Sequence, residues 1–123
     1  MSAAVPNASR AAAVGRAAAY ADSGALQRDL ASLVAYRTES QNPDQRDALY
    51  DYLRTAVAPR LQGLGFSCQV KDNPVDGGPP FLIGERLEDP AQPTVLMYAH
   101  GDVVRGYDAV SYTHLRAHET PEH

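Results

Sequence analysis

Thr94-Val95-Leu96-Met97-Tyr98-Ala99-His100-Gly101-Asp102 is the stretch of this 123-residue chain that decides the predicted fold. Its centre, residues 95–99, is apolar at every position and lacks the alternation of a strand with one face in water. A continuous apolar run of this length is typical of a central strand that is covered on both faces. Because such strands belong to layered proteins that mix helices with a sheet, the stretch predicts an α/β fold.

Two amphipathic helices are expected before this strand, each with an apolar stripe that faces the core. The first begins near Ser23, whose hydroxyl can cap it. The second begins at Asn42 and Pro43, which suit the N-cap and the first helical position. Pro59 is expected to kink or split the second helix. The stripes consist of Leu26, Leu30, Leu33 and Val34 in the first helix and Leu49, Leu53, Val57 and Leu61 in the second.

The periodicity changes from helix to strand after Gly63 and Gly65, which are expected to end the second helix in a left-handed turn. Residues 66–71 alternate between apolar and polar, which predicts a half-buried strand. Residues 81–87 form a second predicted strand, and the apolar run at 94–99 a third. The order is therefore two to three helices followed by three strands.

Residues 1–22 form a separate alanine-rich helix or tail. The part that ends at Tyr20 contains Arg10 and Arg16 and no acidic residue, a composition also found in targeting peptides. A secretory signal needs a strongly apolar central run, which alanine does not supply. An alanine helix at the edge of an ordered domain is therefore the preferred interpretation.

The composition excludes several classes of protein. Lys and Arg number 11 against 15 Asp and Glu, so the net charge of -4 argues against a nucleic-acid binder. No apolar stretch is long enough to suggest a membrane span. The single cysteine, Cys68, cannot form a disulfide within the chain, which favours a cytoplasmic location. Its place on the apolar side of a strand favours a small core residue over a nucleophile.

His100 and Asp102 are the candidate site residues. Two residues apart on an extended chain, they point to the same side. A histidine that ligates a metal uses one ring nitrogen, and the other commonly donates to a carboxylate that fixes its orientation. On spacing alone the pair is also compatible with a turn at the end of a strand.

The segment at residues 94–104 resembles the first metal-binding segment of the zinc-dependent exopeptidase and aminoacylase family, which includes carboxypeptidase G, acetylornithine deacetylase, succinyl-diaminopimelate desuccinylase and carnosine dipeptidase. Members carry a buried strand ending in a small residue, then His, any residue, Asp and Val. The preceding layout is similar too, with a Thr-Glu-Ser-Gln-Asn-Pro loop at 38–43, a longer helix and Leu-Gly-Phe at 64–66. The resemblance spans roughly residues 26–106.

By this resemblance, His100 corresponds to a zinc ligand and Asp102 to the catalytic-site carboxylate that orients it without binding metal. It implies that residues 23–109 are the N-terminal, incomplete part of a three-layer α/β metallopeptidase catalytic domain. The complete parent would hold two zinc ions, form a homodimer in some relatives, and hydrolyse amide bonds of small peptides or N-acyl amino acids through a metal-activated water. The general-base Glu and the remaining ligands would lie further along.

Residues 110–123 depart from the family and are expected to be a non-native tail. Residues 110–120 resemble the translation, in one reading frame, of a transposon-type sequencing adapter. Codons such as GTC-TCT-TAT-ACA-CAT-CTC-CGA-GCC-CAC-GAG would spell residues 110–119. His114 and His118 lie four residues apart, a spacing that suits zinc on a helix. If the tail is adapter-derived, that spacing has no biological meaning, and segments of this kind are excluded from fold predictions.

Two other functions compete with this one. The first is a non-catalytic α/β binding or interaction module in which His100 and Asp102 only close a turn. The second is a nucleotide-binding α/β half, which is disfavoured because no Gly-x-Gly-x-x-Gly or Walker segment follows any predicted strand. With one histidine ligand and no general base, the chain as written is expected to lack peptidase activity.

Overall fold

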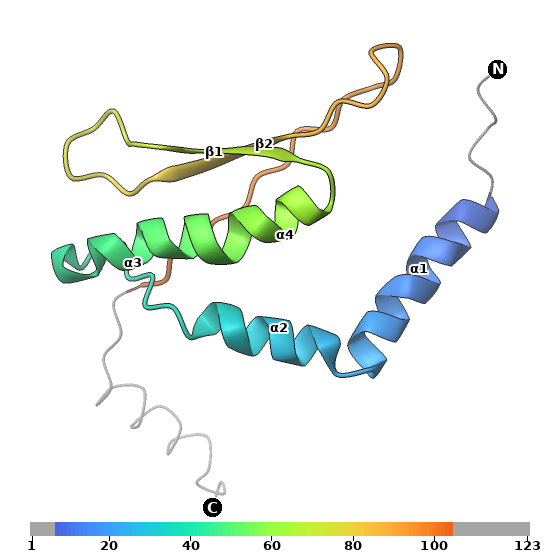
Figure 1. The fold of residues 1–123 in the computed structure, drawn as a ribbon, viewed down its shortest axis with the longest axis horizontal. Coiled ribbons are helices and arrows are strands. Elements are labelled where there is room, and N and C mark those ends of the chain that lie inside the picture. The colour runs from blue at the N-terminus through green and yellow to red at the C-terminus, as the bar shows by residue number, and fades with distance from the viewer. Residues whose placement is uncertain (1–6, 105–123) are drawn as a thin grey trace, which may run out of the picture. The chain divides into compact units, whose positions relative to one another are not determined.

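The computed structural model describes residues 7–104 of the chain. The chain divides into two compact units, Met1–Ala35 and Tyr36–His123. The first contains two helices, and the second combines a long, irregular helical segment with a small antiparallel sheet (Figure 1). The mixture of helices and strands confirms the predicted α/β character at this coarse level.

The first unit consists of α1 (Asn7–Asp22) and α2 (Ala25–Val34). The turn between them depends on Gly24, whose φ of 83° lies in the left-handed region that glycine adopts without strain. Gly24, rather than Ser23, occupies the N-cap position of α2. The hydroxyl of Ser23 accepts a hydrogen bond from the backbone N–H of Ala25, the first residue of α2, at 3.4 Å.

The apolar stripe of α2 was expected to face a core, and this prediction is wrong for the described residues. Leu26, Leu30 and Val34 are all exposed, and α2 contains no buried residue. The physical reason is that a two-helix unit offers only one neighbouring surface, so a stripe along α2 finds few partners within it.

The second unit begins its helical segment with η1 (Pro43–Gln45), a 3-10 turn. Asn42 is its N-cap, and the side-chain Oδ1 accepts from the N–H of Asp44 at 3.1 Å. Such a cap contributes about 1 kcal/mol. Pro43 occupies the first position, where its missing N–H costs nothing. The predicted start of the second helix is thereby confirmed.

The helical segment then runs through α3 (Arg46–Asp51), η2 (Tyr52–Val57) and α4 (Ala58–Gly63), where η2 is a π-helical stretch. Pro59 explains the irregularity, since it has no N–H to bond the carbonyl four residues earlier. A side-chain hydrogen bond also lies within the segment: the hydroxyl of Thr55 donates to Asp51 O at 2.6 Å. The helical type changes from π to α just before Pro59, and the segment continues through Pro59 to Gly63, so the chain is not split there.

The helical segment ends at Gly65, whose φ is 89°, so the predicted left-handed stop is confirmed at this glycine. The chain then forms β1 (Ser67–Lys71) and returns as β2 (Phe81–Glu85). The strands are antiparallel, with Ser67 opposite Glu85. The two strands lie along one side of the α3–α4 segment (Figure 1), and α4 contacts both strands. The buried apolar residues of the described chain are Leu49, Ala56 and Ala58.

The third strand, predicted at residues 94–99, is not formed in the described part of the chain. The segment has no regular secondary structure, and Leu96 is 96% exposed and Tyr98 90% exposed. A central strand needs a hydrogen-bonded neighbour at each edge and a covering layer on each face. The described residues supply neither, so the apolar run stays in solvent.

None of the helices in residues 7–104 combines the length and the apolar character that crossing a bilayer requires.

Candidate functional site

The candidate site forms where the residues after the apolar run return to the loop that precedes η1. The backbone N–H of Val103 donates to Thr38 O at 2.8 Å, and the hydroxyl of Thr38 donates to Gly101 O at 2.8 Å. Glu39 and Val103 form an isolated parallel bridge. Thr38 is only 3% exposed. Two segments more than 60 residues apart in sequence are thereby fixed side by side.

Asp102 lies between Ser40 and His100. The hydroxyl of Ser40 donates to Asp102 Oδ2 at 2.6 Å. On the other side, His100 Nδ1 lies 3.1 Å from Asp102 Oδ1 and 3.2 Å from the backbone oxygen of Asp102. The two oxygens of one carboxylate therefore have separate partners, which fixes the plane of the carboxylate as well as its position.

The two oxygens near His100 Nδ1 determine how the neutral ring holds its proton. A backbone carbonyl only accepts hydrogen bonds, and an ionised carboxylate also only accepts. Both contacts therefore favour the tautomer with the proton on Nδ1, which leaves the lone pair on Nε2. The side chain of His100 is 72% exposed and that of Asp102 is 41% exposed.

The electrostatics of Asp102 follow from the same contacts. The hydrogen bond from Ser40 lowers the pKa of the Asp102 carboxyl below its ordinary value. Partial burial opposes this shift, and the contact with His100 acts in the same direction as Ser40. The carboxylate is thus kept ionised, so that both of its oxygens act as hydrogen-bond acceptors.

Gly101 lies against the ring of Tyr52 at the start of η2. A Cβ atom at position 101 would approach Tyr52 Cε1 to 2.5 Å, closer than such atoms normally come. The Tyr52 ring also meets the Tyr36 ring edge-on, with centroids 5.5 Å apart. A side chain at position 101 would therefore require the Tyr52 ring to move. The irregular helix therefore helps to position the His-Gly-Asp segment.

The donor set fits one zinc ligand position and does not by itself fit a complete zinc site. His100 offers Nε2 on an exposed ring whose other nitrogen is held by a carboxylate, the usual arrangement for a ligating histidine. Zinc sites in proteins use three or four protein ligands. Within residues 7–104, no group of three or more His, Cys, Asp or Glu side chains comes together.

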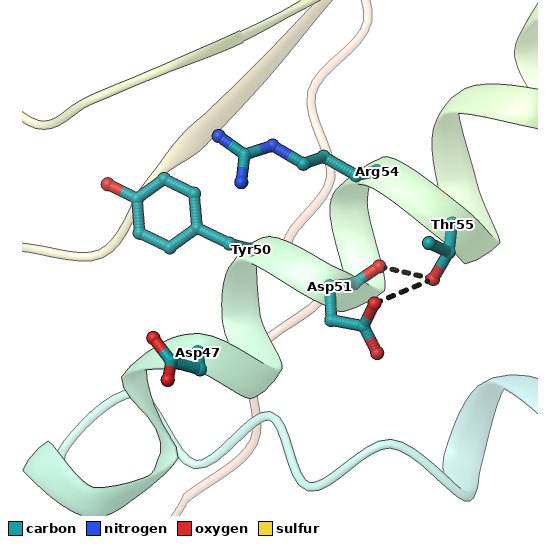
Figure 2. A pocket seen from close by; sticks show the side chains of 5 residues that line it. All are labelled: Asp47, Tyr50, Asp51, Arg54 and Thr55. Atoms are coloured by element: carbon teal, nitrogen blue, oxygen red, sulfur yellow. Dashed lines mark hydrogen bonds between the residues drawn. The ribbon is translucent and has the colours of Figure 1, made fainter.

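A separate depression of about 380 Å³ lies on the helical segment and is lined by Asp47, Tyr50, Asp51, Arg54 and Thr55 (Figure 2). Arg54 lies over the Tyr50 ring, with Cζ 5.0 Å from its centroid. The Tyr50 hydroxyl donates to Asp72 Oδ1 at 2.5 Å. That hydrogen bond is the main reason why the pKa of Tyr50 is raised above its ordinary value. Neither His100 nor Asp102 lines this depression.

The sequence singled out His100 and Asp102, and the structure brings these two together. The sequence did not assign roles to Thr38, Ser40 or Tyr52, whose contacts with residues 101 and 102 the structure shows. Thr38 and Ser40 belong to the loop that formed part of the family resemblance. No local pattern identifies them, because their contacts depend on long-range folding. Cys68 is half-buried, with Sγ 3.9 Å from Ala58 O, which is compatible with a packing role.

The tail at residues 110–123, with His114 and His118, lies outside the described residues. No protein-family model matches this chain, and neither does any curated protein or solved structure.

Proposed function

We propose that residues 23–109 belong to a zinc-dependent hydrolase that cleaves amide bonds of small peptides or N-acyl amino acids, with His100 as one zinc ligand. The observation that supports this proposal is a pair of side-chain hydrogen bonds: Ser40 donates to one oxygen of Asp102, and His100 Nδ1 contacts the other. A carboxylate that orients a ligating imidazole is a recurrent feature of zinc sites. The resemblance to the exopeptidase and aminoacylase family supplies the reaction type and the expectation of two zinc ions.

In this proposal each described residue has a defined task. His100 would offer Nε2 to the metal, and Asp102 would hold the ring in the required tautomer and orientation. Thr38 would fix the backbone at Gly101, so that ring and carboxylate keep their separation. A bound zinc ion would supply an activated water and would polarise the amide carbonyl. The general base and the other ligands would have to come from outside residues 7–104.

The genomic sequence around the codons for residues 105–123 tests the family assignment. In an independent genomic read, we expect the codons from position 110 onward to differ from the adapter sequence. We also expect the reading frame to continue with an Asp and then a Glu-Glu pair at later strand ends. A read that reproduces residues 110–123 as printed and lacks those later residues would contradict the proposal.

The purified chain offers a second test. The 123-residue product should show no zinc-dependent hydrolysis of dipeptides or N-acyl amino acids, because the described residues give the metal only one histidine. A complete parent gene product should be active and should lose activity on His100→Gln. His114→Gln in the 123-residue chain is a matched control, because any zinc that the tail binds through His114 would be lost in this variant while His100 is kept. Zinc-dependent turnover by the 123-residue chain would contradict the expected incompleteness of its site.

A non-catalytic interaction module is the second candidate function. It is favoured by the absence, within residues 7–104, of a group of three His, Cys, Asp or Glu side chains that could hold a metal ion. The hydrogen bond between Ser40 and Asp102 also favours it, because this bond gives Asp102 a structural role without a metal. In that case Asp102→Asn would reduce stability in the complete protein without any zinc-dependent activity to lose.

We also expect the protein to reside in the cytoplasm, since a lone cysteine suits a reducing compartment.

A further inference from the structure

We propose that Ser40 is a positioning residue that sets the tautomer of His100 by holding Asp102. The hydroxyl of Ser40 donates to Asp102 Oδ2 at 2.6 Å and not to His100. The opposite oxygen, Oδ1, faces His100 Nδ1 at 3.1 Å. Ser40 therefore acts on the imidazole through the orientation of the carboxylate between them.

The geometry makes Asp102 depend on a partner at Oδ2. An Asp carboxylate rotates easily about its terminal torsion, where there is no sharp staggered preference. Its side chain is 41% exposed, so water competes for both oxygens when no fixed donor is present. The Ser40 hydroxyl supplies such a donor on one side, which leaves Oδ1 turned toward Nδ1.

Ser40 is itself held in place from a distance. It follows Thr38 and Glu39, the residues that are hydrogen-bonded and bridged to Gly101 and Val103. The two backbone segments cannot slide past each other without breaking these bonds. The loop before η1 therefore places Ser40 beside Asp102 as part of one paired structure.

The tautomer does not depend on a metal, because the contacts to Nδ1 come from Asp102 alone. That this tautomer prepares Nε2 for zinc rests on the proposed function. The tautomer of His100 and the zinc-dependent function can therefore be disproved separately. A protein with the expected tautomer and no zinc-dependent activity in its complete form would contradict only the proposed function.

The experiment is nitrogen-15 NMR of the imidazole in the full chain at a pH well above the ordinary histidine range, where the neutral ring reports its tautomer. The His100 signals are assigned as those absent from the His100→Gln spectrum. In the wild-type chain, Nδ1 should be the protonated nitrogen in the dominant form. In Ser40→Ala, the ratio of the Nδ1–H to the Nε2–H tautomer should fall about fivefold, the effect of losing one ordinary hydrogen bond.

Ser40→Thr keeps the hydroxyl and should restore the wild-type ratio, which a loss of packing alone would not predict. Ser67→Ala removes a hydroxyl that donates to Glu85 O on the hairpin and should leave the ratio unchanged. An unchanged ratio in Ser40→Ala with a folded amide spectrum would overturn the proposal. A wild-type chain with mainly Nε2–H would overturn it without any variant, even if Ser40→Ala fails to fold.

Discussion

At the scale of the residue, Gly101 is the position where the candidate site tolerates least change. It lies against the Tyr52 ring, and its carbonyl accepts a hydrogen bond from the Thr38 hydroxyl. A side chain here would have to displace the Tyr52 ring, which is held in turn by Tyr36. Because well-packed side chains move only at a cost in free energy, adding one methyl group at position 101 should destabilise the site.

We therefore expect Gly101→Ala to lower the free energy of unfolding by about 1–3 kcal/mol, the usual cost of overpacking. Unfolding in denaturant, monitored by circular dichroism, measures the free energy of unfolding of both chains. The cause is checked in a Tyr52→Ala background, where the ring is gone and the same substitution should cost less than about 0.5 kcal/mol. An equal cost in both backgrounds would show that the Tyr52 contact is not responsible.

Tyr50 gives a pH-dependent prediction, because its neutral hydroxyl donates to Asp72 and its ionised form cannot. Its pKa in the folded chain is raised above the unfolded value. The resulting stabilisation is therefore present below about pH 10 and is lost as the pH rises through the folded pKa. Unfolding measured from neutral to strongly alkaline pH should show this loss in the wild-type chain.

Asp72→Asn removes the negative acceptor and should bring the pKa of Tyr50 down toward its ordinary value, as followed by carbon-13 NMR of the tyrosine ring. Asp76→Asn, in the same loop, is the matched control and should leave the Tyr50 titration unchanged. A Tyr50 titration that is identical in the wild-type and Asp72→Asn chains would contradict the assigned cause.

At the scale of the element, the end of the helical segment depends on one backbone conformation. Gly65 has a φ of 89° and leads directly into β1. Gly63, two residues earlier, is in the last turn of α4, and a Cβ there would meet nothing within 4 Å. The two glycines therefore differ in conformation although both were expected to end the helix.

We expect Gly65→Ala to destabilise the chain by about 1 kcal/mol, because an L side chain in the left-handed region is strained. Gly63→Ala should be neutral or stabilising, since alanine loses less entropy in a helix than glycine does. Thermal unfolding of the two variants provides the comparison. Equal destabilisation by both would show that left-handed strain at Gly65 is not the decisive factor.

Local elements were predictable from the sequence, and the parts that need distant partners were not. The cap at Asn42, the left-handed stop at Gly65 and the alternating strand at β1 each depend on residues within one turn or one strand. The strand at 94–99 depends on neighbours that the described chain does not supply.

The candidate site divides in the same way. His100 and Asp102 were identified because their spacing is local, and they do meet. Ser40 and Tyr52 were not identified, because their contacts with residues 101 and 102 form only when the loop before η1 pairs with the end of the described chain. Polar residues near the start of a helix have many ordinary roles, so nothing in their own neighbourhood marks them.

At the scale of the whole molecule, the described chain leaves much apolar surface uncovered. Val95, Leu96, Met97 and Tyr98, four consecutive residues of the apolar run, are all exposed. Only three apolar residues are buried in the described part. Soluble monomers rarely expose contiguous apolar patches larger than a few hundred Å². An extended apolar segment with unpaired backbone groups also invites pairing with another chain.

The purified 123-residue chain should therefore self-associate through the apolar run. Leu96→Lys places a charge at its most exposed position and should weaken association at least about tenfold, because burying one leucine contributes roughly 1.5–3 kcal/mol. Leu64→Lys, an exposed leucine outside the run, is the control and should change association little. Sedimentation velocity over a range of concentrations distinguishes the three chains. A wild-type chain that stays monomeric at every concentration would mean that other residues cover the run, and equal effects of both lysine substitutions would point to general charge repulsion instead.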